Sequence, residues 1–333
     1  MERIVVEIDN KITVVIPNYN GMQYIEKCLQ SLEKQSMREF SIIVIDNGST
    51  DGSAELVQDT FPSIQVVCMG ANTGFSSAVN KGIELSDTCY VILLNNDTTV
   101  DINFVEEMEQ SISKSEKIFS VSAKMVDMKN PKLIDGAGDL YCALGWAFAR
   151  CKGDFVQKAN KECKVFSACA GAAIYRKSVL DEIGVFDEHH FAYLEDVDLG
   201  YRARIYGYEN WYTPKAIVYH AGSAVSGSRY NEFKISLASK NSVYLIYKNM
   251  PWIQILFNIP LLVFGFLVKI LFFMKKGYGT LYCKGIIRGI CFCHTKEAKE
   301  RRVPIRFKNN TNYLIIQWEL WINCIRKLVL GRN

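Results

Sequence analysis

Short runs of apolar, largely β-branched residues alternate in the first hundred positions with segments that read as amphipathic helices. The runs cover residues 12–17, 41–45, 64–69 and 90–94. Continuous apolar runs of this length are typical of strands covered on both faces, as in parallel sheets. Between the first two runs, one face of a predicted helix carries Ile25, Cys28, Leu29 and Leu32. This alternation predicts an α/β fold with a doubly wound, mostly parallel sheet.

Beyond residue 103 the pattern becomes less regular. A helix and a short strand are predicted from about Phe104 to Val121, and residues 127–155 have the pattern of an irregular insertion or loop. A second ordered block, residues 163–220, predicts a strand, a helix from about Lys177, an acidic turn, a helix through Asp198 to Tyr206 and a strand that ends at His220. We therefore expect one large domain over residues 1–235 and a helical region over residues 236–333.

The predicted helical region contains two segments suited to a membrane. Residues 252–274 have about the length of a membrane span, but polar residues and a proline interrupt the segment at Gln254, Asn258, Pro260 and Lys269. Residues 313–330 place Trp318 and Trp321 near Arg326–Lys327, a pattern typical of interfacial helices. A pair of helices that pack into a protein core is the alternative interpretation.

The charge distribution favours the membrane interpretation. From Lys269 onward 14 Lys and Arg stand against three acids, giving +11, whereas residues 1–268 carry −7. Such a segment attracts phosphates, either of lipid or of nucleic acid. Because apolar and aromatic residues lie among these charges, and each basic residue near anionic lipid contributes about 1 kcal/mol, we expect a membrane surface as partner and no nucleic acid.

The eleven cysteines stand mostly singly in apolar segments, and the opening sequence MERIVVEIDN lacks the features of a signal peptide. Both observations predict a reduced, cytosolic protein. The one cluster, at Cys291, Cys293 and His294, has no second pair of ligands at a spacing typical of zinc, so we do not expect a zinc site there.

Polar residues follow the ends of several predicted strands, where doubly wound sheets bind their ligands. Asn95, Asn96 and Asp97 end the fourth strand, and their oxygens can seat a hard divalent cation that bridges to a diphosphate. An Asn/Asp turn that only caps the strand is the alternative. The run from Asp46 to Ser53 can cap a helix that starts at Ser49 or Asp51, and this leaves Asp46 free to accept a hydrogen bond from a nucleobase. Tyr19 offers a stacking face.

Two further groups are candidates for chemistry. Glu195 and Asp196 are either ordinary acids of a first helical turn or, in their apolar surroundings, a general base. Arg202 can pair with these acids or with a diphosphate. His220 is either a structural histidine or a second metal ligand beside Asp97.

Together these motifs resemble family 2 glycosyltransferases with the GT-A fold, and among them the bacterial rhamnosyltransferase-like members. The resemblance covers roughly residues 11–225 and rests on the ordered segments VVIPNYNG, VIDNGSTDGS, NTGFSSAVNKGI, LLNNDTTV, ACAGAAIYRKSVLDEIGVFDE and FAYLEDVDLGYRAR. The family's metal motif often reads Asp-x-Asp, whereas amides precede Asp97 here.

The resemblance implies roles for the matching residues. Binding of the nucleotide and the donor falls to Pro17, Tyr19, Asn20, Asp46, Asn72, Gly74, Asn96 and Arg202. Asp97 is the expected ligand of Mg²⁺ or Mn²⁺, with His220 as a further ligand. Asp196 is the expected catalytic base, and Glu195 is its neighbour in the catalytic pair.

The implied activity is inverting transfer of a sugar from a nucleoside diphosphate donor to a glycan hydroxyl. By resemblance the donor is dTDP-rhamnose first and a UDP-sugar next. The acceptor is a lipid-linked bacterial surface glycan at the cytoplasmic face of the membrane. A nucleotidyltransferase or NAD enzyme is one alternative, although the first turn reads NYNG and not G-x-G-x-x-G. A catalytically silent binding or scaffold protein is the other.

Overall fold

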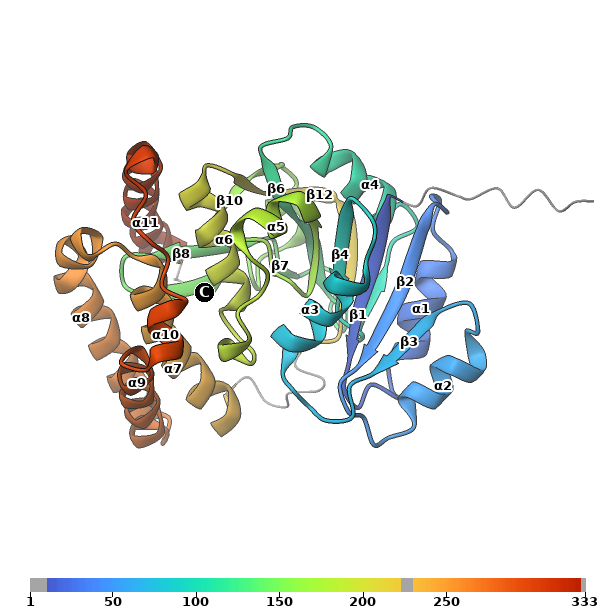
Figure 1. Cartoon of the computed structure of the whole chain (residues 1–333), viewed down its shortest axis with the longest axis horizontal. Helices are drawn as coiled ribbons and strands as arrows, with labels where there is room; N and C mark the ends of the chain where they lie inside the picture. The colour runs from blue at the N-terminus through green and yellow to red at the C-terminus, as the bar shows by residue number, and fades with distance from the viewer. Residues whose placement is uncertain (1–10, 223–229, 331–333) are drawn as a thin grey trace, which may run out of the picture.

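The computed structural model describes residues 11–222 and 230–330 (Figure 1). The opening segment, on which the signal-peptide prediction rests, lies outside the described residues, as do residues 223–229 and 331–333. Within the described part, a central mixed sheet of ten strands carries helices on both faces, and further helices gather at one end of the molecule (Figure 1).

Four parallel strands form the N-terminal half of the sheet, in the spatial order β4-β1-β2-β3. They are β1 (Ile12–Asn18), β2 (Phe40–Asp46), β3 (Gln65–Cys68) and β4 (Tyr90–Leu94). Because the strands are parallel, their carboxyl ends meet at one edge of the sheet, as the sequence predicts.

The second half of the sheet is mixed. Strand β11 (Ala172–Arg176) runs antiparallel between β4 and β6 (Ile118–Asp127), and β12 (Glu209–His220) runs parallel to β6. The short strands β5 (Thr98–Val100), β7 (Ile134–Gly136) and β10 (Cys163–Val165) pair with β12, β6 and β12 respectively. The side chains of β1 alternate between two cores, with Val14 and Ile16 on one face and Val15 on the other.

Helices cover each face of the sheet. One face holds α1 (Ile25–Glu33), α2 (Ser53–Thr60) and α4 (Phe104–Ile112). The other holds α3 (Phe75–Leu85), α5 (Lys177–Ile183) and α6 (Glu195–Tyr206). Full burial of one large aliphatic side chain stabilises a fold by about 1.5–3 kcal/mol, so the two cores hold the strand ends in fixed positions.

The C-terminal helices pack against the side of the molecule that carries α6. They are α7 (Glu232–Asn249), α8 (Trp252–Lys275), α9 (Gly279–Cys293), α10 (Lys296–Glu300) and α11 (Asn310–Leu330). A third apolar cluster joins α6, α7, α8 and α11 to the hairpin of β8 (Asp139–Cys142) and β9 (Trp146–Ala149). Figure 1 shows these helices, in orange and red, at the end of the molecule opposite β1–β3.

The structure confirms the mixed α/β architecture and corrects several local predictions. The segment 127–155 is not irregular throughout, because it contains β7 and the β8–β9 hairpin. Strand β6 is ten residues long, and α6 begins at Glu195, three residues before the predicted start. Helix α8 continues through Pro260.

Candidate active site

One cavity of about 650 Å³ lies at the carboxyl ends of β1 and β4. Its wall also includes the end of β12, the β8–β9 hairpin and the loop that precedes α6. The structure brings eight of the predicted site residues to this cavity: Pro17, Tyr19, Asn72, Asn96, Asp97, Glu195, Asp196 and His220.

Sheet register places Asp97 beside His220. Strand β5 starts directly after Asp97 and pairs with the end of β12, so that Thr98 lies opposite His220. The backbone N–H of Ala221 donates to the carbonyl of Asp97 at 3.0 Å. As a result His220 Nε2 lies 3.3 Å from Asp97 Oδ1.

A third residue, Asp135 at β7, fixes the other side of the histidine ring. His220 Nδ1 lies 2.7 Å from Asp135 Oδ2. Burial disfavours the charged imidazolium, but the hydrogen bonds with Asp135 and Asp97 outweigh burial and raise the pKa of His220 to about 9. Burial alone would raise the pKa of Asp135, but its hydrogen bond with His220 and the charge of Lys152 outweigh burial and hold this pKa well below its usual range.

This arrangement suits a divalent cation. A carboxylate and a neutral imidazole nitrogen that converge on one point are ordinary ligands of Mn²⁺, with the cation taking the place of the Nε2 proton, and the carboxylate also suits Mg²⁺. A histidine that binds a metal usually donates the N–H of its other ring nitrogen to a carboxylate or carbonyl, which orients the ring. Asp135 occupies that position for His220, so Nε2 of the ring is directed toward Asp97.

The amide directly before Asp97, Asn96, makes its hydrogen bond within the protein. Asn96 is buried, and its side chain donates to Asn18 Oδ1 at 2.7 Å. Asn18 in turn donates to Asp46 at 2.9 Å and to Ser53 at 2.8 Å. Asn96 therefore ties the end of β4 to the ends of β1 and β2, which is the turn-capping role, while Asp97 beside it faces the cavity.

The backbone that leads into Glu195 and Asp196 is strained. Phe191, Tyr193 and Leu194 all have positive φ, at 62°, 71° and 70°. Non-glycine residues in this region cost about 1–3 kcal/mol each and persist only where surrounding contacts hold them. Such strain is common at functional sites.

Helix α7 supplies the contacts that hold this loop. Asn241 is fully buried, and its Nδ2 donates to the carbonyls of His190, Ala192 and Tyr193 at 2.9–3.0 Å. Lys240 donates to the carbonyl of His189 at 2.7 Å. The C-terminal region therefore takes part in building the site.

The two adjacent acids differ in their surroundings. Glu195 is buried, its Oε2 has no hydrogen-bond partner among the described residues, and burial raises the pKa of this carboxyl well above its usual range. Asp196 accepts a hydrogen bond from the backbone N–H of Val197 at 2.7 Å and another from Ala170. Burial also raises the pKa of Asp196, but these donors oppose the shift. Asp196 is therefore the better stabilised carboxylate.

Four predicted residues do not reach the cavity wall: Asn20, Asp46, Gly74 and Arg202. Arg202 differs most from the donor-binding role expected from the sequence. Its guanidinium is buried, pairs with Asp198 at 2.9 Å and donates to the carbonyls of residues 183–185. These contacts tie α6 to the end of α5 and occupy the guanidinium inside the protein.

The other three residues support the floor of the site. Asp46 accepts from Asn18 and from the backbone N–H of Ser49 at 3.0 Å. Asn20 accepts from the backbone N–H of Thr50 at 2.9 Å. A Cβ atom at Gly74 would lie 2.7 Å from the ring of Phe191, so a glycine is needed there for the strained loop to approach.

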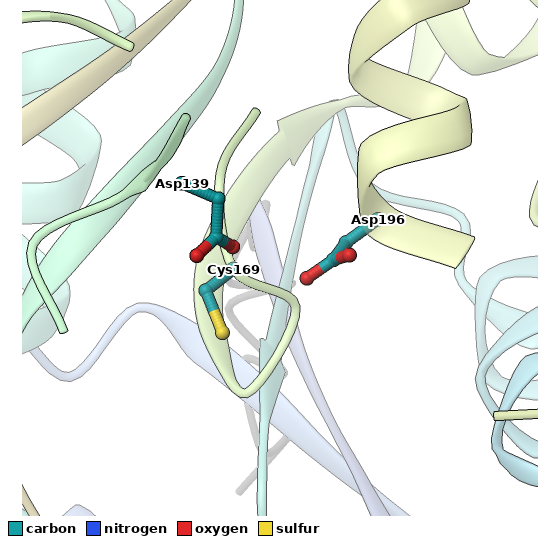
Figure 2. Close-up of side chains that lie close together, drawn as sticks. All are labelled: Asp139, Cys169 and Asp196. Carbon is teal, nitrogen blue, oxygen red and sulfur yellow. The ribbon is translucent and has the colours of Figure 1, made fainter. Parts of the chain in front are cut away.

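Sequence reasoning missed several polar side chains of the cavity wall, among them Asp135, Asp139 and Cys169. Figure 2 shows the carboxyl groups of Asp139 and Asp196 directed toward one another, with the sulfur of Cys169 beside them. One ligand atom from each of the three lies within 4.8 Å of the others. The missed signal was the pair of carboxylates in the segment IDGAGD, which the sequence places in an apparent loop.

Comparison with known proteins identifies the family. The family model "Glycosyl transferase family 2" matches residues 13–184, just over half of the chain. An N-acetylglucosaminyl-diphospho-decaprenol L-rhamnosyltransferase of Mycobacterium tuberculosis is 27% identical over 231 residues, which cover 62% of this chain and 75% of the relative. A poly-beta-1,6-N-acetyl-D-glucosamine synthase of Staphylococcus epidermidis is 24% identical over 209 residues, covering 62% of this chain and 48% of the relative.

Solved structures share the fold. GalNAc-T7 with UDP, GalNAc and Mn²⁺ aligns with a TM-score of 0.57 at 16% identity, over 72% of this chain and 48% of that chain. The mannosyltransferase PcManGT of Pyrobaculum calidifontis, in complex with GDP-Man and Mn²⁺, aligns with a TM-score of 0.54 at 13% identity, over 97% of this chain and 88% of that chain. The fold is therefore the expected GT-A fold, and the chain belongs to glycosyl transferase family 2 and is a glycosyltransferase.

Proposed function

We propose that the protein transfers a sugar, with inversion, from a nucleoside diphosphate donor to a hydroxyl of a lipid-linked glycan. The proposal rests on the side chains that line one cavity. The Asp97–His220 pair and the carboxylate of Asp196 come from separate elements and line the same space. A cation-binding pair and a separate base are the two functions that such a transfer requires.

The proposed reaction is a single displacement. Asp196 accepts the proton of the acceptor hydroxyl, whose oxygen forms a bond to the anomeric carbon of the sugar. The bond between that carbon and the diphosphate oxygen breaks, and the electron pair leaves with the nucleoside diphosphate. Because the acceptor attacks from the face opposite the leaving group, the configuration at the anomeric carbon inverts.

Asp97 and His220 would hold the Mg²⁺ or Mn²⁺ ion, with Asp135 orienting the histidine. When bound, such an ion neutralises the charge of the leaving diphosphate. Tyr19 is 36% exposed and lies at the cavity wall with Pro17, where its ring can stack on a nucleobase. The Mn²⁺ complexes of GalNAc-T7 and PcManGT support the choice of a divalent cation.

The relatives support the choice of donor and acceptor. The mycobacterial rhamnosyltransferase acts, by its name, on an acceptor with a diphospho-decaprenol group, so dTDP-rhamnose is the first donor to test and UDP-sugars the next. The position of β9 supports the proposal of a lipid acceptor, because this strand lines the cavity and also contacts α8. Residues 147–149 of β9 line the cavity, and Trp146 at the start of the same strand donates to the carbonyl of Gly265 in α8 at 3.1 Å.

The exposed face of α8 supports a position at a membrane surface. Among the described residues, α8 is the single helix that is long and apolar enough to cross a membrane. Its outward face carries large apolar side chains, and Phe257 is 69% exposed. The outward face of α11 adds Leu314, Ile315, Trp318 and Ile325. Exposed apolar side chains that gather on one face of a helix mark an interaction site.

The inward face of α8 favours a helix that lies in the membrane interface over one that spans it. Gln254 is buried between Tyr201 and the carbonyl of Tyr313. Asn258 and Gln317 exchange two hydrogen bonds at 2.8 and 2.9 Å. Spanning would place these amides in hydrocarbon and break their contacts, whereas an in-plane helix keeps them and gives its apolar face to lipid.

Two experiments test this function. The first is a panel of nucleotide-sugars assayed for release of nucleoside diphosphate, with Mn²⁺, in the presence and absence of a lipid-linked acceptor. Acceptor-dependent release is the expected result. Release of pyrophosphate would indicate nucleotidyl transfer instead, and tight nucleotide binding without turnover would indicate a silent scaffold.

The second experiment tests the membrane surface by flotation with anionic liposomes. Phe257→Glu places a charge on the outward face of α8 and should release the protein from the liposomes. Ile102→Glu is the matched control, since Ile102 is also exposed but precedes α4 on the sheet domain. Equal binding of the two variants would contradict the lipid-facing role of α8.

A further inference from the structure

Asp139 is a carboxyl group that faces the proposed base from a different element. It is the first residue of β8, whereas Asp196 lies in the first turn of α6. Both residues are half-buried at the cavity, and their carboxyl oxygens lie within 4.8 Å of each other (Figure 2). Two ionised carboxylates at such a separation repel strongly, so at neutral pH the pair is expected to hold one proton.

The surroundings decide which carboxyl keeps that proton. Asp196 accepts hydrogen bonds from the backbone N–H groups of Val197 and Ala170, which stabilise its ionised form. Burial, and then the negative charge of Asp196, raise the pKa of Asp139 well above its usual range. The hydrogen bond between the two carboxyls favours neutral Asp139 and ionised Asp196.

The backbone around Asp139 is anchored on both sides. Its N–H donates to the carbonyl of Ser167 at 2.9 Å, and its own carbonyl accepts from Phe166 at 2.9 Å and from Ser167 at 3.3 Å. On the other side, Asp139 pairs with Ala149 of β9. The contact with Asp196 is therefore built by two separate strand pairings.

We propose that Asp139 is a positioning residue for the base: it remains protonated and donates a hydrogen bond that keeps Asp196 ionised and directed into the cavity. This inference rests on the proposed role of Asp196 as the base. It adds a residue outside the motifs that carried the resemblance, and it assigns a function to the β8–β9 hairpin.

The other titratable groups near the pair come from several elements and loops. Lys152, after β9, lowers the pKa of Asp139, whereas Asp135 of β7 raises it. Cys169 before β11 is half-buried and Tyr175 within β11 is buried, and burial first and the nearby carboxylates second raise the pKa of each. Both groups therefore stay neutral, and burial first and the charge of Asp196 second raise the pKa of Glu195 on the same helix. Among Asp139, Glu195 and Asp196, the ionised form is best stabilised at Asp196, which accepts backbone hydrogen bonds.

The test compares pH profiles of kcat/KM for two substitutions of nearly equal shape in the full chain. Asp139→Leu removes the donor, so Asp196 becomes harder to ionise and the acid limb should move up by about one to two pH units. At a pH below the acid limbs of both the wild type and the variant, kcat/KM of Asp139→Leu should then be about tenfold to a hundredfold lower than that of the wild type. Asp139→Asn keeps an N–H donor, so its acid limb should stay within about 0.3 pH unit of the wild type, with a modest loss of rate.

Several outcomes would overturn the proposal. An acid limb that moves down in Asp139→Asn would mean that Asp139 is ionised and raises the pKa of the base by repulsion. An unmoved limb in Asp139→Leu, with a changed KM alone, would mean a structural role only. If Asp139→Leu does not fold, Asp139→Asn still decides between a fixed limb and a downward shift.

The control variants separate this proposal from the proposed function. If Asp196 is the base, Asp196→Asn should abolish transfer whatever the role of Asp139. Only the pH profiles of the Asp139 variants then test the present inference. Transfer that survives Asp196→Asn would instead refute the assignment of the base. Asp181→Asn, on the exposed side of α5, removes a carboxylate far from the pair and should leave the acid limb in place.

Discussion

Asn241 offers a test of whether the C-terminal region builds the catalytic site. Its side chain donates from α7 to three carbonyls of the loop that precedes Glu195 and Asp196. Asn241→Leu keeps the approximate volume and removes both donor hydrogens. The loop carbonyls then lose their buried partner, at about 1–3 kcal/mol for each acceptor left unsatisfied.

The expected loss of activity follows from the strain in the loop. Phe191, Tyr193 and Leu194 have positive φ, and each such residue costs about 1–3 kcal/mol that the surrounding contacts must offset. Without the Asn241 contacts the loop relaxes, and the acids that follow it shift. A displacement of about 1 Å can lower a catalysed rate roughly a hundredfold, so kcat should fall by about that factor while KM for the donor changes little.

The assay is steady-state release of nucleoside diphosphate, combined with urea unfolding. The free energy of unfolding should fall by about 2–4 kcal/mol. Asn249→Leu is the matched control, because Asn249 is also buried on α7 but donates to Asp198 and to its own helix. If both variants lose similar stability and similar activity, the loss in Asn241→Leu reflects general destabilisation and the positioning role is refuted.

Three further predictions concern buried charges. Lys248→Met removes the cation between Asp187 and Asp198, at 2.7 and 2.9 Å, and should cost about 3–5 kcal/mol in urea unfolding at pH 7. Lys248 holds the pKa of both acids well below the usual range despite their burial, so the wild type keeps this stability down to the unfolded-state pKa of about 4 and loses it only as the pH falls further. In the variant both pKa values rise, and the deficit should shrink as pH falls from 7 to 4; a constant deficit would contradict the account. Asp135→Asn should weaken Mn²⁺ binding about tenfold to a hundredfold in a titration, whereas unchanged affinity would remove Asp135 from the site. Arg202→Met should lower stability by about 3–5 kcal/mol without raising KM for the donor, and a raised KM at unchanged stability would restore the donor-binding role.

The features that sequence predicted well depend on local pattern. Apolar runs identify parallel strands, and parallel strands bring their carboxyl ends together, so the pattern alone could place Tyr19, Asp97 and His220 at one edge of the sheet. The same reasoning located Glu195 and Asp196 at the start of a helix. These residues stand beside strong strand or helix signals.

The features that sequence missed depend on register and on long-range contacts. Asp135 meets His220 because a three-residue strand, β7, pairs with β6, and such a short strand gives no periodic signal. Asn241 reaches the loop before α6 from a helix 48 residues downstream of Tyr193. The sequence suggests phosphate as the partner of Arg202 because a guanidinium binds phosphate well. Its actual partners are backbone carbonyls at the end of α5 and just after it, and the sequence does not indicate them because every residue has a carbonyl.

The pair Asp196→Asn and Glu195→Gln tests the central claim most directly, because the two variants neutralise adjacent carboxyls at the start of α6. The measurement is the rate of sugar transfer to a verified acceptor at saturating donor, with nucleotide binding measured in parallel. The account predicts that Asp196→Asn lowers kcat by about a hundredfold to ten-thousandfold with nucleotide affinity retained, and that Glu195→Gln costs far less. Transfer by Asp196→Asn at the wild-type rate would contradict it.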